Sequence, residues 1–132
     1  MYLLFNLSIR DTLKLSLFSP KEIFNQEYSG LNRDLILCLD KFLKENKLKK
    51  KQIEGIMVVV GAGGFTSERI AVTVANTFGY VLQIPLLTIN QTQADDPQKL
   101  IPKLLKQPKG QYISATYSGE ANITMAKKFV IC

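Results

Sequence analysis

The stretch that decides the fold is IMVVVGAGGFTSERI, at residues 56–70. Its opening run of apolar residues, rich in valine, predicts a strand inside a sheet that helices flank. The glycines that follow predict a tight turn, because glycine adopts backbone conformations that other residues avoid. Thr66 or Ser67 is the predicted N-cap of a helix, and Glu68 in its first turn suits the helix dipole. The stretch therefore predicts strand, turn and helix in an α/β fold.

Three shorter strands are predicted before this stretch. Residues 2–9 are rich in Leu and Phe, and residues 12–18 alternate between apolar and polar side chains, as a half-buried strand does. Arg10 and Asp11 between them predict a tight hairpin turn. Residues 22–28 can form a third strand. Three consecutive strands joined by turns predict an antiparallel meander.

A helix is predicted over residues 30–46, because apolar residues recur there at helical spacing. This apolar stripe consists of Leu31, Leu35, Ile36, Cys38, Leu39, Phe42 and Leu43. It is wider than a helix lying on one sheet requires. The excess suggests that the helix is covered from a second side.

The second helix, predicted over residues 66–83, lies in a part of the sequence with no charged residue between Arg69 and Asp95. Its apolar face contains Ile70, Val74, Phe78, Val81 and Leu82, and the opposite face contains Thr73, Asn76, Thr77 and Tyr80. Surface helices normally place charges on such a face, so small uncharged residues suggest that it is partly covered. The cover is either a partner protein or another part of this chain, such as the first helix.

A short strand at residues 86–89 and a short helix over residues 97–106 are predicted next. Asp96 before Pro97 is the predicted N-cap of this helix. Asp95 and Asp96 are interpreted as capping residues rather than metal ligands, because no third oxygen ligand is close in sequence. A final hairpin is predicted from residues 111–117 and 122–131.

The composition predicts one domain with a packed core, since 46% of the 132 residues are hydrophobic and 21% are charged. No apolar run is long enough to span a bilayer, and the first residues predict a strand rather than a signal peptide. Cys38 and Cys132 show no metal or redox spacing, which predicts a reduced, cytoplasmic protein. The absence of histidine excludes Ser–His and Cys–His catalytic pairs. We expect no catalytic residue, no metal and no cofactor.

The net charge of +6 is partly concentrated in Lys47, Lys49, Lys50 and Lys51. These lysines either contact RNA phosphates or form a solvated helix end, where cations meet the negative end of the dipole. The second interpretation is preferred, because no aromatic residues for base stacking are interleaved with the lysines.

A strand followed by glycines and a helix is also the layout of a phosphate-binding loop. The candidate residues are Gly61, Gly63, Gly64, Phe65, Thr66 and Arg69. The spacing fails the dinucleotide fingerprint, because the third glycine of that motif would fall at Thr66. From the residues alone, a structural turn is the preferred interpretation.

The same segment resembles the signature of the TsaB (YeaZ-type) family, Gly-Pro-Gly-Ser-Phe-Thr-Gly-Leu-Arg-Ile-Gly. The matching residues are Gly61, Gly63, Phe65, Thr66, Arg69 and Ile70. Residues 48–56 and 84–86 resemble the sequences that flank the signature in the family, and residues 112–120 resemble the hairpin that opens its second lobe. TsaB is a subunit in the synthesis of threonylcarbamoyladenosine on tRNA.

The resemblance implies an RNase H-like lobe of the actin, sugar kinase and Hsp70 superfamily. Such a lobe has a mixed five-stranded sheet with flanking helices, and here a C-terminal β-hairpin is expected in addition. Residues 1–109 would form the N-terminal lobe, and residues 110–132 a hairpin packed on it, so we expect a truncated relative. The family's Asp-Thr-Ser at the end of the first strand is replaced by Asn6-Leu7-Ser8, which removes the acid and argues against nucleotide catalysis.

In function, the resemblance implies a non-catalytic subunit that binds and stabilises a TsaD-like catalytic partner, or pairs with a second copy of itself. Contact with tRNA would occur only through the complex, and no membrane is involved. The expected interface residues are Leu35, Leu39, Phe42, Ile70, Thr73, Val74, Thr77 and Phe78. The alternatives are a stand-alone nucleotide- or phosphate-binding module that uses the glycine loop, and a degenerate homodimeric interaction module.

Overall fold

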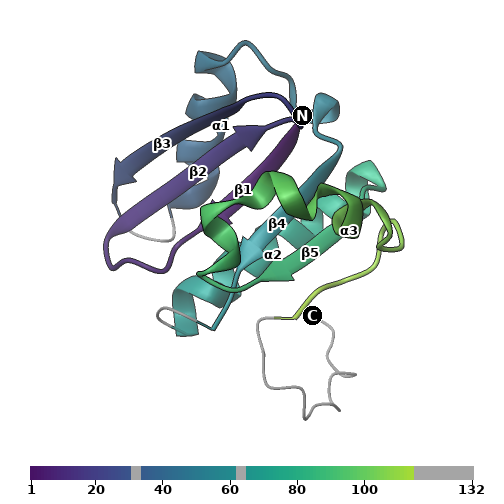
Figure 1. Cartoon of the computed structure of the whole chain (residues 1–132). Coiled ribbons are helices and arrows are strands. Elements are labelled where there is room, and N and C mark those ends of the chain that lie inside the picture. The colour runs from purple at the N-terminus through teal and green to yellow at the C-terminus, as the bar shows by residue number, and fades with distance from the viewer. Residues whose placement is uncertain (31–33, 62–64, 115–132) are drawn as a thin grey trace.

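A mixed five-stranded sheet in the order β3-β2-β1-β4-β5 forms the centre of the computed structural model, which describes residues 1–30, 34–61 and 65–114 (Figure 1). The strands are β1 (Tyr2–Asn6), β2 (Thr12–Phe18), β3 (Ile23–Ser29), β4 (Gly55–Val59) and β5 (Leu86–Ile89). β2 pairs antiparallel with β1 and with β3. β4 pairs parallel with β1 and with β5. The predicted meander and the predicted mixed sheet are both confirmed.

Helices cover both faces of this sheet (Figure 1). The long helices α1 (Leu35–Glu45) and α2 (Phe65–Leu82) share one face, where α1 packs on β2 and α2 packs on β4 and β5. The opposite face is covered by the short helices η4 (Pro97–Leu100) and α3 (Ile101–Leu105). Two further 3-10 turns, η2 (Lys50–Gln52) and η3 (Gln93–Asp95), lie in the connections.

The alternation of side chains along the strands divides the core into two layers. On β1, Leu3 and Phe5 pack beneath α1 and α2, whereas Tyr2 and Leu4 pack beneath α3. The cover on the α3 side is close, because a Cβ on Gly55 would lie 2.7 Å from Leu104 Cδ2. This close approach explains why glycine begins β4.

Several predicted boundaries are wrong by a few residues. β1 ends at Asn6 rather than at residue 9, and β4 begins at Gly55 rather than at residue 52, because η2 occupies residues 50–52. α2 begins at Phe65, so Thr66 and Ser67 lie within its first turn and neither of them is the N-cap. Helix starts are set by local capping geometry, which the hydrophobic pattern does not reveal.

The remaining differences lie near the ends of elements. α1 begins at Leu35 rather than at residue 30, and residues 31–33 lie outside the described part. Asp96 precedes η4 as predicted, but its side chain makes no cap hydrogen bond and pairs with Lys99 at 3.4 Å. Residues 111–114 form no strand, and the rest of the predicted hairpin lies outside the described residues. Across the described part of the chain, no helix combines the length and the apolar character that crossing a membrane requires.

Candidate interaction site

The outward side of α1 carries exposed apolar side chains. Three predicted interface residues, Leu35, Leu39 and Phe42, are only 1%, 1% and 2% exposed, because they form the core beneath the helix. Ile36 and Leu37 point away from this core and are 56% and 72% exposed. Ile36 and Leu37 are therefore the apolar side chains that α1 offers to a partner.

The predicted interface residues of α2 divide into two groups. Val74 is buried, and Ile70 and Phe78 are partly buried against the core under the helix. Thr73 and Thr77 are exposed, and the Thr77 hydroxyl donates a hydrogen bond to the Thr73 carbonyl at 2.9 Å. Because this hydrogen bond lies within α2, the surface of the helix around these two threonines remains exposed and uncharged.

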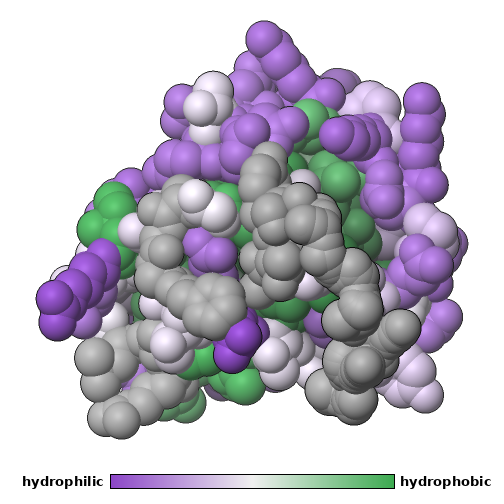
Figure 2. All heavy atoms as spheres, turned by 90° about the horizontal axis from the view of Figure 1, so that it is seen from below, coloured by the Kyte–Doolittle hydropathy of each residue, from purple (hydrophilic) through white to green (hydrophobic). Residues whose placement is uncertain are grey.

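Two large side chains near the end of α2 extend this surface. Tyr80 is 62% exposed and Val81 is 69% exposed. They lie in the region between residues 70 and 94, which contains no charged residue. Figure 2 shows one side of the molecule, on which separate hydrophobic patches reach the surface between hydrophilic residues. Exposed apolar residues on neighbouring elements are typical of protein contact sites.

Part of α2 is covered by the chain itself. The Asn76 amide nitrogen donates to the Ile113 carbonyl at 3.0 Å, and the Ile113 N–H donates to Asn76 Oδ1 at 2.8 Å. These two bonds fasten the segment after α3 along α2, and Ile113 packs against the core. Ile113 thus covers part of this edge of α2. The uncharged face indicates a cover, but no pattern in the sequence identifies the segment that provides it.

Tyr28 joins β3 to α1 and so fixes the helix on the sheet. Its hydroxyl donates to Glu45 Oε1 at 3.0 Å, and Lys41 Nζ lies 5.9 Å from the centre of its ring. Burial, together with the hydrogen bond to Glu45 and the negative charge of that carboxylate, raises the pKa of Tyr28 to about 12.

The glycine loop begins with a residue whose backbone only glycine adopts easily. Gly61 has a φ of 80° and is exposed, which confirms the predicted tight turn at this position. Phe65 is the first residue of α2, and Thr66 and Arg69 in the following turn are exposed. Gly63 and Gly64 lie outside the described residues.

A cavity of about 550 Å³ lies beside the start of α2. It is lined by residues 7–11 between β1 and β2, by residues 12–13 at the start of β2, by Gly30, and by Thr66 and Ser67. The charged residues in its lining are Arg10 and Asp11, whose opposite signs give no net attraction for an anion. The cavity is large enough for a small ligand, but its charge does not select a phosphate.

Asn6 stands where the resembling family has an acid. Its Oδ1 accepts hydrogen bonds from the Ser8 N–H at 3.1 Å and from the Ser8 hydroxyl at 2.6 Å, and Ser8 Oγ lies 3.1 Å from Gln91 Oε1. A neutral amide that is already bonded to its neighbour provides no negative charge for a cation. Among the residues that the structure describes, no three Asp, Glu, Cys or His side chains come together to hold a metal.

The sheet order, with three antiparallel strands followed by two parallel ones, and the pair of long helices on one face define an RNase H-like lobe of the actin, sugar kinase and Hsp70 type. A family model described as TsaD, tRNA N6-adenosine threonylcarbamoyltransferase, matches residues 30–126. The chain belongs to this family.

The fold is shared by solved structures, among them YeaZ and a protein with similarity to YeaZ. YeaZ from Pseudomonas aeruginosa aligns with a TM-score of 0.61 and 19% identity over 74% of this chain and 50% of its own. An uncharacterised protein described as similar to peptidase YeaZ from Pseudomonas aeruginosa aligns with a TM-score of 0.61 and 20% identity, over 73% of this chain and 49% of its own. The chain thus spans about half of the length of each. The predicted TsaB (YeaZ-type) relationship is confirmed for family and fold, and no curated protein matches the sequence.

Proposed function

We propose that this chain is a non-catalytic subunit that binds and stabilises a TsaD-like catalytic protein during threonylcarbamoyladenosine modification of tRNA in the cytoplasm. The observation that carries the proposal is the set of exposed apolar side chains on the outward sides of α1 and α2. Ile36 and Leu37 come from α1, and Tyr80 and Val81 come from α2. The exposure of apolar side chains to water is unfavourable in free energy, and contact with a protein partner would remove these side chains from water.

The chemistry of the chain supports a binding role over a catalytic one. The sequence contains no histidine, so no serine or cysteine has the usual general base. Asn6 is bonded to Ser8 in the place of the family's acid. The TsaD-like protein would therefore supply the chemistry, and this chain would position and stabilise it. Contact with tRNA would follow from the complex.

Co-expression with the TsaD-like protein of the same genome tests this proposal. With an affinity tag on the TsaD-like protein, we expect this chain to co-purify in equal amounts. Leu37→Glu and Val81→Glu should each weaken the complex at least about 10-fold, because each places a charge in an apolar contact. The matched control is Leu105→Glu, an exposed leucine on α3 at the opposite face, which should co-purify normally.

Two outcomes would contradict the proposal. One is that the unchanged chain fails to co-purify although circular dichroism shows that both proteins are folded. The other is that Leu37→Glu and Val81→Glu co-purify as well as Leu105→Glu does. The second outcome would show that a complex forms through some surface other than the α1 and α2 side.

The cavity beside Thr66 supports a second candidate function, the binding of a nucleotide or phosphate. Its volume of about 550 Å³ and its position at the start of α2 favour this function, whereas the paired charges of Arg10 and Asp11 do not. Binding of ATP or ADP would raise the melting temperature by mass action. An unchanged melting temperature at millimolar nucleotide would exclude this function.

A self-associating module would use the same outward sides of α1 and α2. Light scattering of the isolated chain separates the two cases, because a homodimer has twice the mass of a monomer that awaits its partner. A monomer alone that forms a complex with the TsaD-like protein supports the proposed function. A stable dimer that Leu37→Glu dissociates supports self-association.

A further inference from the structure

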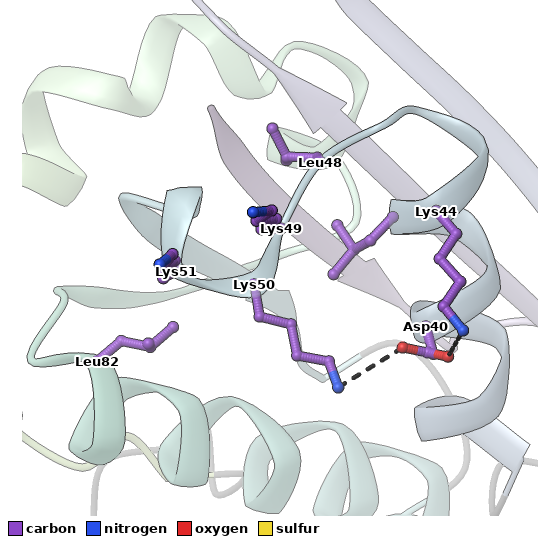
Figure 3. Close-up of a pocket in the computed structure, with 8 residues that line it drawn as sticks. Asp40, Lys44, Leu48, Lys49, Lys50, Lys51 and Leu82 are labelled. Atoms are coloured by element: carbon purple, nitrogen blue, oxygen red, sulfur yellow. Dashed lines mark ion pairs between the residues drawn. The ribbon is translucent and has the colours of Figure 1, made fainter.

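A basic cavity of about 490 Å³ opens where the ends of α1 and α2 meet the η2 turn (Figure 3). Its apolar lining comes from one leucine of each element or connection, namely Leu43 of α1, Leu48 before η2, and Leu82 at the end of α2. The other lining residues are charged, namely Asp40, Lys44, Lys49, Lys50 and Lys51. The cavity thus combines apolar side chains with a concentration of positive charge.

The lysines outnumber the acid in this lining. The Asp40 carboxylate is shared by two ammonium groups, Lys44 Nζ at 3.1 Å and Lys50 Nζ at 3.6 Å (Figure 3). The hydrogen bond from Lys44 lowers the pKa of Asp40, which keeps this carboxyl group ionised. In the part of the chain that the structure describes, no acid forms an ion pair with Lys49 or Lys51. The ammonium groups of Lys49 and Lys51 therefore face solvent at the cavity with no ion-pair partner among the described residues.

We propose that this cavity docks an acidic peptide segment of a partner protein, with an apolar side chain inserted between Leu43, Leu48 and Leu82. Carboxylates of the segment would pair with Lys49 and Lys51, and its apolar residue would fill the space between the leucines. Single-stranded RNA fits less well, because it is held by aromatic side chains on which bases stack, and none lines this cavity.

This site goes beyond the proposed function, because it lies at the ends of the two helices and requires no TsaD-like protein. The positive net charge of the whole chain also favours an acidic partner over a basic one. The lysine cluster was apparent in the sequence. The apolar residues beside it were not, because Leu82 lies on a different helix, far from the lysines in sequence.

Fluorescence anisotropy with the full chain tests the proposal. The probe is a fluorescein-labelled ten-residue peptide of glutamates with two central leucines, and a second probe has serines in place of those leucines. We expect the leucine probe to bind more tightly than the serine probe and binding to weaken with added salt. In Lys49→Ala/Lys51→Ala, binding of the leucine probe should fall about fivefold, the effect expected of two solvent-exposed ion pairs.

The matched control variant is Lys103→Ala/Lys106→Ala, which removes the same charge from exposed lysines near α3 and should change binding less than about twofold. An equal loss in both variants would overturn the proposal, because binding would then depend only on net charge. Equal binding of the leucine and serine probes would overturn the role of the apolar lining. Tighter binding of a ten-nucleotide oligouridine than of the leucine probe would assign the cavity to RNA instead.

Discussion

The two faces of the sheet are covered in different ways. On one face, α3 is short, and its exposed Leu105 lies between Lys103 and Lys106 in sequence. A single apolar side chain among charges is ordinary for a protein surface. On the other face, α1 and α2 carry exposed apolar residues, and α2 has no charge after Arg69.

This difference indicates the side of the molecule on which a partner is expected to bind. The α3 side exposes less apolar surface, because Leu105 has lysines beside it in sequence and Ile23, opposite Phe18 at the edge of the sheet, is only 38% exposed. The α1 and α2 side buries the larger core beneath the helices and still leaves Leu37 and Val81 in water. A covered inner side together with an apolar outer side is typical of a helix that packs between two layers.

The largest expected effect comes from the core under the long helices. Phe5→Ala should lower the free energy of unfolding by about 3–5 kcal/mol, because the fully buried ring leaves a cavity that its neighbours cannot fill. Urea denaturation measures the loss. The control is Phe24→Ala on the edge strand β3, where the ring is 44% exposed, and the loss there should stay below about 1 kcal/mol. Equal losses would place Phe5 outside the main core.

A substitution in the core under α3 should lower the free energy of unfolding by a smaller amount. Leu104→Ala removes a fully buried side chain that contacts the start of β4. We expect the free energy of unfolding to fall by about 2–4 kcal/mol, because a short helix can partly collapse onto the space. Leu105→Ala on the same helix should change it by less than about 0.5 kcal/mol. A loss at Leu104 greater than that at Phe5 would reverse the comparison of the two faces.

The two hydrogen bonds between Asn76 of α2 and Ile113 are expected to contribute less to the free energy of unfolding than either core does. Asn76→Ala removes both hydrogen bonds to Ile113 and should lower the free energy of unfolding by about 1–2 kcal/mol. It should also speed tryptic cleavage after Lys109, because residues 111–114 lose their attachment. Thr77→Ala, which removes one exposed bond within α2, is the control and should leave cleavage unchanged. Unchanged cleavage in Asn76→Ala would show that other contacts hold the segment.

The sequence predicted most of the fold, because its signals were local. Alternation at residues 12–18 gave β2, and the apolar run before Gly61 gave β4. The family signature then predicted the sheet as a whole. Helix and strand ends were less predictable. At the end of β1, for example, the Ser8 N–H donates a hydrogen bond to Asn6 Oδ1, and the hydrophobic pattern does not predict this bond.

The candidate site was harder to predict for a different reason. A wide apolar stripe shows that a helix has two apolar sides, but it does not show which side faces the sheet. The stripe therefore predicts Leu39 at a partner interface, although Leu39 lies in the core, whereas Leu37, which is not among the predicted interface residues, is exposed. The bond between Asn76 and Ile113 joins residues that are distant in sequence, so only the folded chain reveals it.

The hydrogen bond between Tyr28 of β3 and Glu45 of α1 predicts that the protein loses stability at high pH. The pKa of Tyr28 is raised from 10.0 to about 12, so the folded state holds the phenol proton more tightly than the unfolded state does. Its contribution is complete below pH 10 and is lost as the pH rises through about 12. Denaturation at stepwise pH measures this loss, which Tyr28→Phe should reduce and the exposed control Tyr112→Phe should not. Identical curves for both variants would contradict the assignment to Tyr28.

The smallest expected effect is the one on which the comparison of the two faces most depends. In the isolated chain, Leu37→Glu and Leu105→Glu should each change the free energy of unfolding by less than about 0.5 kcal/mol, because both side chains are mostly in water. Urea denaturation of the two variants side by side measures this. If both are as stable as the unchanged chain, loss of partner binding in Leu37→Glu alone reports on the surface of α1 and not on folding. A clear destabilisation by Leu37→Glu would instead mean that Leu37 belongs to the core, and the outward apolar side of α1 would then need no partner to explain it.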